Sequence, residues 1–327
     1  MRDYTHHMEM YNSSTSGTEY TNLSTTVQKL VENSRVFYRN NRWRILSILL
    51  SGSLTWKTSG ICSDADISVV TRFHYDIFLG KKMCQFLQRR IPRIRIEVGV
   101  YPLSRLTSGL DRSHYLYDLK YNSVVLAGND PRHRIPKIDV NDLYPFEAFL
   151  MILNRSIDLI RSIANFTSEE IAVNNKMLKT AIARIQRAYV DSLLIFEKTY
   201  HPNYAQRMQI FNSLYGSLPK TETFADARAL ILESLNQGLR KSRIRSYESL
   251  FNQLESRYLY PADFRLYAFV KTKEPSALFH NPIYDVYRKV VRFFRLGQLE
   301  DKKWTDFRTS VLRVFDNSPK PCLTRLE

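Results

Sequence analysis

Polar and apolar residues alternate along residues 64–70, where Ala65, Ile67 and Val69 interleave with Asp64 and Asp66. A period of two predicts a β-strand, here from about 64 to 72. On such a strand both aspartates point to one face, while the apolar side chains face the core. The alternation therefore predicts a strand that is buried on one side and acidic on the other.

Similar patterns predict the neighbouring elements of the N-terminal part. An apolar run predicts a strand from about 44 to 51, and helical spacing predicts helices at about 27–37 and 75–90. In residues 93–100 the apolar residues fall at every second position, so Glu97 points to the opposite face. A segment of apolar residues ending at Leu126 leads to Gly128-Asn-Asp-Pro131, which is a turn signal.

Beyond residue 142 the pattern changes to that of long helices. An apolar stripe at spacings of three and four residues predicts one long helix, formed by Leu178, Ile182, Ile185, Tyr189, Leu193, Phe196 and Tyr200. Further helices are expected at about 146–164, 224–238, 243–257 and 283–296. Strands followed by helices favour an α+β chain with an all-α C-terminal part. We expect a flexible lead over 1–25, a catalytic domain over 26–140 and a helical domain over 141–327.

The acidic face carries the candidate chemistry. Two carboxylates side by side repel each other, and burying them without partners is costly. A divalent cation removes this conflict, and hard oxygen ligands select Mg²⁺ or Mn²⁺. With Glu97 as a third acid on a neighbouring strand, the set is suited to two metal ions roughly 3.5–4 Å apart, as used for phosphoryl displacement. The alternative is a solvated edge strand with surface acids.

Gly52-Ser53 follows the first predicted strand. Glycine allows a phosphate to approach the backbone, and Ser53 offers a hydroxyl and an N–H group where a helix could begin. The pattern of apolar run, Gly-Ser, about a dozen residues, Asp-x-Asp and a later acid resembles the nucleotidyltransferase superfamily that includes DNA polymerase beta. Within it the chain looks like the small antibiotic nucleotidyltransferases and related prokaryotic proteins. The resemblance covers roughly residues 26–135.

The resemblance implies a nucleotidyltransferase domain with a mixed β-sheet flanked by helices, followed by a helical bundle. It implies an NTP-dependent enzyme that transfers NMP to an acceptor hydroxyl and releases pyrophosphate. Asp64, Asp66 and Glu97 would hold the metal ions and be catalytic. Nucleotide-binding candidates are Gly52, Ser53, Lys57, Lys176 and Lys179. Lys57 stands where many relatives carry a small-Arg-Gly stretch, and Lys176 and Lys179 also fit a solvated helix face. A catalytically silent nucleotide-binding or interaction module of the same fold is the alternative.

Composition bears on the partners. The net charge is +16 and leans toward the C-terminal half, which suits triphosphates and RNA. The acceptor is therefore either a small molecule or RNA, such as tRNA, and two basic clusters are candidates for binding it: Arg240, Lys241, Arg243 and Arg245, and Arg288, Lys289, Arg292 and Arg295. No apolar run is long enough to predict a membrane helix, and no secretory signal is evident. Three unpatterned cysteines favour reduced thiols and a cytoplasmic location.

Overall fold

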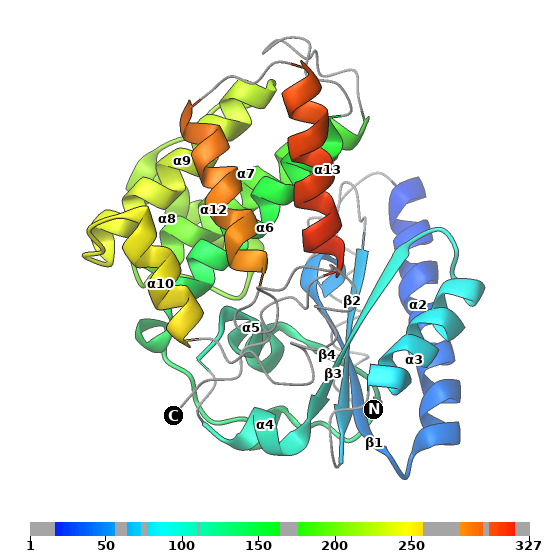
Figure 1. Cartoon of the computed structure of the whole chain (residues 1–327). Helices are drawn as coiled ribbons and strands as arrows, with labels where there is room; N and C mark the ends of the chain where they lie inside the picture. The colour runs from blue at the N-terminus through cyan, green and yellow to red at the C-terminus, as the bar shows by residue number, and fades with distance from the viewer. Residues whose placement is uncertain are drawn as a thin grey trace. The chain divides into compact units, whose positions relative to one another are not determined.

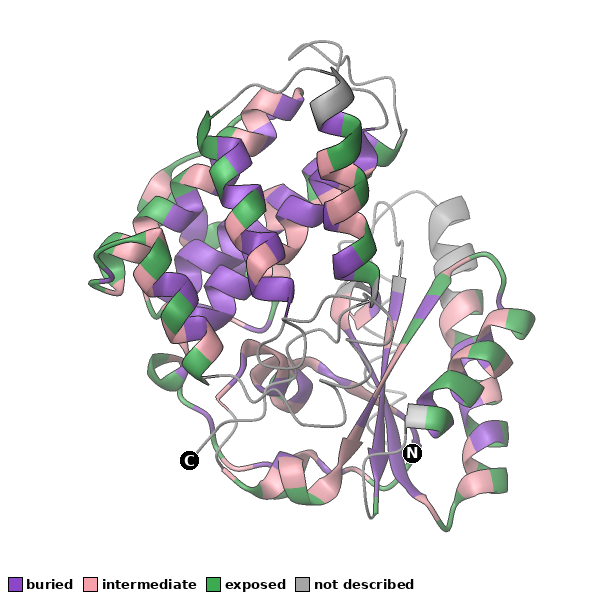
Figure 2. Ribbon diagram, in the orientation of Figure 1, coloured by how far each residue is buried: buried purple, intermediate pink, exposed green. Residues whose placement is uncertain are grey.

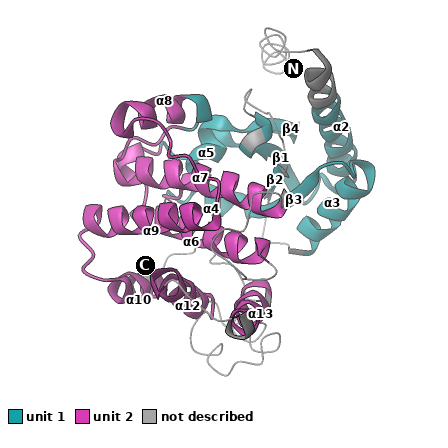
Figure 3. Ribbon diagram, turned by 90° about the horizontal axis from the view of Figure 1, so that it is seen from above, with its two compact units in different colours: residues 1–110, 115–137, 202–205 teal, residues 111–114, 138–201, 206–327 magenta. Residues whose placement is uncertain are grey.

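The computed structural model of the chain describes residues 17–55, 64–72, 77–109, 112–163, 176–257, 282–296 and 301–317. The chain divides into two compact units that interleave in sequence (Figure 3). The first contains Met1–Leu110, Tyr115–Lys137 and Pro202–Ala205. The second contains Asp111–His114, Ile138–His201 and Gln206–Glu327. The domain boundaries expected at 25 and 140 stay predictions.

A mixed four-stranded sheet forms the centre of the first unit. Its strands are β1 (Ile45–Ser51), β2 (Asp64–Thr71), β3 (Arg95–Pro102) and β4 (Val124–Gly128), in the order β3-β2-β1-β4. β2 runs parallel to β3, while β1 is antiparallel to both β2 and β4. The short helices α4 (Leu103–Thr107) and α5 (His114–Asn122) connect β3 to β4. The strands predicted around residues 44–51, 64–72 and 93–100 are all present.

Two helices cover one face of this sheet, α2 (Gly17–Asn41) and α3 (Ile77–Arg90) (Figures 1 and 2). Leu30 of α2 and Met83 of α3 are fully buried and belong to the same core as the apolar positions of β2. The core on this face contains one side of every strand. On the two acidic strands its members are Ala65, Ile67, Val69, Ile96 and Val100. Burying a side chain of this kind stabilises the fold by about 1.5–3 kcal/mol. The apolar face therefore fixes which residues point the other way.

Helix α2 overlaps the expected flexible lead. It begins at Gly17, although residues up to 25 were predicted to be a lead because they are rich in Ser, Thr and Asn. These residues have low helix propensity. A helix nucleus is costly, but adding residues to an existing helix is not. The packed turns around Leu30 and Val31 supply that nucleus, so the helix extends toward the N-terminus.

The second unit is all α in the residues that the structure describes. Its helices are α6 (Pro145–Ser162), α7 (Lys176–Phe196), α8 (Tyr204–Tyr215), α9 (Phe224–Lys241), α10 (Tyr247–Arg257), α12 (Ile283–Leu296) and α13 (Asp301–Asn317). Together with the mixed sheet, this confirms the predicted α+β class with a helical C-terminal region. No described helix combines the length and the apolar character needed to cross a membrane.

Helices α7 and α9 both end in residues with left-handed backbone. Lys198 has a φ of 60° and Arg243 a φ of 56°. Each helix closes with the same pair of hydrogen bonds, such as Thr199 N to Leu194 O at 2.9 Å and Lys198 N to Ile195 O at 3.1 Å. Glycine is the usual residue at this position, because an L-residue there costs roughly 1–2 kcal/mol. A cation near a helix C-terminus recovers only about 0.3–1 kcal/mol.

Candidate active site

The acidic face belongs to β2, opposite the face that α2 and α3 cover. Ala65, Ile67 and Val69 are at most 2 % exposed, so the side chains between them must point away from that core. Asp66 accordingly lies on the other face and is partly exposed. Asp64 lies two residues earlier on the same strand, and its side chain is outside the described part of the structure. The strand thus places both aspartates in one row.

Glu97 lies beside Asp66 on the parallel neighbour β3. The two residues are direct partners in the strand register, and parallel strands lie about 4.8 Å apart. Glu97 stays exposed because Ile96 and Val100 occupy the buried face. The sequence-predicted pair of acids on neighbouring strands is therefore brought together by the backbone.

An arginine lies in the same acidic row. Arg95 is the register partner of Asp64, and its Nη2 lies 2.7 Å from Oε1 of Glu97. Both side chains are largely exposed, so this ion pair contributes little to stability. The position of this ion pair matters more, because the guanidinium of Arg95 binds the carboxylate of Glu97, which the sequence assigns to a metal ion. Sequence reasoning did not identify Arg95, although its spacing of two from Glu97 puts both on one face.

Gly52 begins the turn that follows β1, the 3₁₀ helix η2 (Gly52–Thr55). Its φ of +76° is in the left-handed region. A Cβ atom on residue 52 would lie 2.1 Å from Oδ2 of Asp66, which is less than any real contact. Ser51 also donates a hydrogen bond from its Oγ to the backbone oxygen of Asp66, at 3.3 Å. Glycine is therefore required here for the carboxylate of Asp66 to lie directly against the backbone.

Two side chains that sequence reasoning missed hold this turn in place. Thr55 Oγ1 donates to the backbone oxygen of Gly52 at 2.7 Å, and Asn122 Nδ2 donates to Thr55 Oγ1 at 3.3 Å. Asn122 is the last residue of α5, so the turn is tied to a helix 67 residues away in sequence. No local pattern in the sequence marks such a link.

The Gly128-Asn-Asp-Pro131 segment anchors the end of α5. Arg132 donates to both carboxylate oxygens of Asp130, at 2.6–3.1 Å, and its Nη1 donates to the backbone oxygen of Ser123 at 2.7 Å. The guanidinium holds the pKa of Asp130 below its usual value. Because Ser123 follows Asn122 directly, this clamp fixes the residue that reaches the Gly52 turn.

The acidic face continues into a group of hydroxyls. Tyr115 of α5 hydrogen-bonds to Ser68, which is two residues beyond Asp66 on β2. Its ring stacks on that of Tyr101, with centroids 5.0 Å apart. Burial raises the pKa of Tyr115 well above its usual value, and neighbouring Tyr101 and Asp66 raise it further. The phenol therefore stays protonated and can donate a hydrogen bond beside the carboxylate.

The remaining predicted site residues are less defined. Ser53 lies in η2, but its side chain is outside the described residues, and so is the whole of Lys57. Lys176 begins α7 without a described side chain, whereas Lys179 is exposed on the same helix. Both lysines belong to the second unit. The predicted nucleotide-binding roles of these four residues stay predictions.

The donor set fits a hard divalent cation. Among the described side chains, no group of three His, Cys, Asp or Glu residues is close enough to hold a metal ion. The carboxylate of Asp64 is not among these described side chains. Asp66 and Glu97 supply oxygen ligands from directly opposed positions, and Asp64 follows in the same row. Carboxylates in this arrangement are the ligands that Mg²⁺ and Mn²⁺ prefer.

Comparisons with known proteins find likeness among solved structures. No protein-family model matches the chain, and no curated protein matches it. Among solved structures, the chain is similar to spectinomycin adenyltransferase AAD(9) from Enterococcus faecialis, which was determined with ATP and spectinomycin. The two share 14% sequence identity with a TM-score of 0.39, over 67% of this chain and 99% of that one.

Proposed function

We propose that the chain is a metal-dependent nucleotidyltransferase that moves NMP from an NTP to an acceptor hydroxyl. The observation that supports this most is the contact between Gly52 and Asp66, with Glu97 in register on the adjacent strand. A glycine turn whose backbone can be approached closely, next to a row of carboxylates, unites the two parts that this chemistry requires. The motif resemblance described above points to the same reaction.

Each residue of the acidic face has a role in this proposal. Gly52 and Ser53 offer backbone N–H groups to the β- and γ-phosphates, and Asp64 and Asp66 hold Mg²⁺ or Mn²⁺. The cation neutralises phosphate charge when it is bound. Glu97 orients the acceptor hydroxyl and accepts its proton as the oxygen attacks the α-phosphorus. The bond between the α-phosphorus and the bridging oxygen breaks, and pyrophosphate leaves.

A silent binding module is the second candidate, and one observation favours it. Arg95 pairs with Glu97 at 2.7 Å and is opposed to Asp64, so the acidic row has its own counter-ion. If the guanidinium keeps that place in the presence of metal, Glu97 cannot act on an acceptor. The nucleotide could then bind without turnover.

Thermal unfolding with and without ligand tests the proposal. An NTP with Mg²⁺ at one hundred times its dissociation constant stabilises a folded protein by about 2.7 kcal/mol. We expect this increment for the wild type and its loss in Asp66→Asn, which keeps the shape but removes the charge. A wild type that does not respond to any NTP with Mg²⁺ or Mn²⁺ contradicts both candidates. A response without pyrophosphate release favours the silent module.

A further inference from the structure

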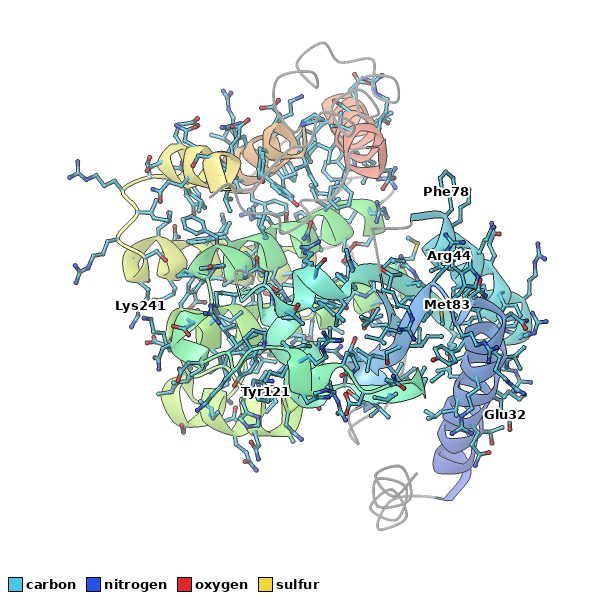
Figure 4. All side chains as sticks on the ribbon, turned by 90° about the horizontal axis from the view of Figure 1, so that it is seen from below. Glu32, Arg44, Phe78, Met83, Tyr121 and Lys241 are labelled. Atoms are coloured by element: carbon cyan, nitrogen blue, oxygen red, sulfur yellow. The ribbon has the colours of Figure 1, made fainter. Side chains whose placement is uncertain are left out.

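Five basic side chains gather where helices α7 and α9 end, and we name them the helix-end cluster: Lys198, Arg240, Lys241, Arg243 and Arg245. The two helices run in the same direction within the second unit. Ser192 hydrogen-bonds to Ser234 at 2.6 Å, and further toward both C-terminal ends Glu197 pairs with Lys241 at 2.8 Å. Their C-terminal ends therefore lie side by side, and Figure 4 labels Lys241 at the end of α9.

The cluster is open to solvent. All five side chains belong to exposed residues, and Lys241 is 46% exposed even within its ion pair. Within the described residues, the salt bridges of this surface are those that Glu197 makes with Lys241. Glu197 also accepts a hydrogen bond from Tyr215 at 2.6 Å, so its charge is shared further. The surface thus keeps a net positive charge.

Two members of the cluster occupy backbone positions that disfavour them. Lys198 and Arg243 have the left-handed conformation at which a helix normally ends in glycine. A cation in the preceding turn would serve the helix end equally well, and Arg240 and Lys241 already do so on α9. Folding alone therefore favours glycine at both positions. The same departure at two adjacent helix ends indicates that the charges serve a purpose outside the fold.

We propose that the helix-end cluster binds the phosphates of an RNA chain that serves as the acceptor. This inference rests on the nucleotidyl transfer proposed above. Arginine supplies three of the five charges, and its planar guanidinium binds phosphate through two parallel hydrogen bonds. Cations spread over two helix ends suit a polymer with one charge per nucleotide better than a single small anion.

The other basic cluster is less suited to this role than the sequence indicates. Arg288 lies within 3.5 Å of carboxylate oxygens of Glu248, Glu255 and Asp285, and its guanidinium stacks on Phe251. It belongs to the packing between α10 and α12. Lys289, Arg292 and Arg295 stay exposed on α12, and Arg295 lies over the ring of Tyr247, two residues beyond Arg245. Arg295 therefore lies next to the segment that carries Arg245.

The test compares the full chain with the double variant Lys198→Gly/Arg243→Gly. Labelled oligouridine is titrated in a salt series without NTP, and Tm is measured in parallel. Each lost phosphate contact lowers the salt slope by about 0.7, so at about 0.1 M salt two contacts cost roughly 25-fold in affinity. The glycines relieve the backbone, so Tm should rise by about 2–4 °C for each. The matched charge control is Lys81→Gln/Arg89→Gln, which removes two exposed cations from α3 in the first unit.

The inference predicts a variant that is more stable but binds RNA more weakly, while the control changes affinity by less than about twofold. Equal affinities and slopes for the wild type and the double variant overturn it. Loss of binding to phosphatidylserine vesicles with unchanged RNA binding also overturns it, in favour of a membrane surface. If RNA binds at the cluster but pyrophosphate is released only with small hydroxyl compounds, the acceptor role of RNA is overturned. If no NTP yields pyrophosphate with RNA or with small hydroxyl compounds, the surface stands and the proposed function fails.

Discussion

Replacing Gly52 with alanine tests the contact between the backbone of residue 52 and the carboxylate of Asp66. Residue 52 has a φ of +76°, and alanine in this conformation costs roughly 1–2 kcal/mol. The new Cβ would lie 2.1 Å from Oδ2 and 3.1 Å from Cγ of Asp66. The carboxylate of Asp66 can rotate away, and the resulting off-rotamer side chain lowers the free energy of unfolding by a further amount of about 0.5–1.5 kcal/mol. We expect a total loss of about 2–3 kcal/mol in the free energy of unfolding.

Two other glycines provide matched controls. Gly216 and Gly109 have φ values of +78° and +73°, so alanine is equally strained at both. A Cβ at Gly216 meets no atom within 4 Å, and one at Gly109 meets only Pro136 at 3.7 Å. Each control should therefore lose only the roughly 1–2 kcal/mol of backbone strain. The difference between Gly52→Ala and the controls reports the displacement of Asp66.

Chemical denaturation with and without an NTP and Mg²⁺ is the assay. The ligand should add about 2.7 kcal/mol at a hundredfold excess over its dissociation constant in the wild type and both controls. In Gly52→Ala this increment should disappear, because the carboxylate of Asp66 no longer faces the ligand. If Gly52→Ala keeps the same ligand increment as Gly216→Ala, the reasoning about this contact is refuted.

Three further predictions concern charge and packing. Asp130→Asn should remove a stabilisation that is fully present above the unfolded pKa of aspartate, about 3.9, and that the wild type loses as the pH falls through the lowered pKa of Asp130. In acid denaturation, the stability difference between the wild type and Asp130→Asn should therefore shrink below about pH 4. A difference that stays constant with pH contradicts the clamp. Arg207→Ala should cost about 3–5 kcal/mol by urea unfolding, because it leaves buried Asp191, now 2.8 Å from the guanidinium, without its ion pair; a loss below about 1 kcal/mol contradicts this. Thr223→Ala should cost about 1 kcal/mol, since Thr223 and Asp226 form the capping box of α9, whereas exposed Thr305→Ala should cost less.

The two acidic strands could be predicted from the sequence because their signal is local. Alternation over Asp64–Val70 and around Glu97 determines which side chains are buried, and the sheet follows the same alternation. The long apolar stripe of α7 and the helices near 146–164, 224–238 and 283–296 are confirmed for the same reason. A pattern that repeats within a few residues can be recognised from those residues alone, without knowledge of the tertiary structure.

Other features depend on distant residues. The strand β4 is only Val124–Gly128, and its pairing with β1 is not encoded in those five residues. Helix α8 buries only Arg207 and Phe211, so it has little apolar periodicity to detect. Such elements are stabilised by tertiary packing, which the local sequence does not reveal.

The candidate site shows the same division. The acids and Gly52 were predicted from their spacing together with the resemblance to the nucleotidyltransferase superfamily, and the register of β2 with β3 places Glu97 beside Asp66. Asn122 and Arg95 were missed, since one acts from a helix far along the chain and the other is a common surface residue. Their roles become visible only when the strands and the turn are assembled.

Pyrophosphate release is the measurement that tests the central claim most directly. The purified full chain is incubated with each NTP, Mg²⁺ or Mn²⁺, and either cellular RNA or a mixture of small hydroxyl compounds. The account predicts metal-dependent pyrophosphate release with at least one combination, and its loss in Asp66→Asn and Glu97→Gln with the fold retained. Release that persists in Asp66→Asn at the wild-type rate would contradict the assignment of the acidic face as the active site.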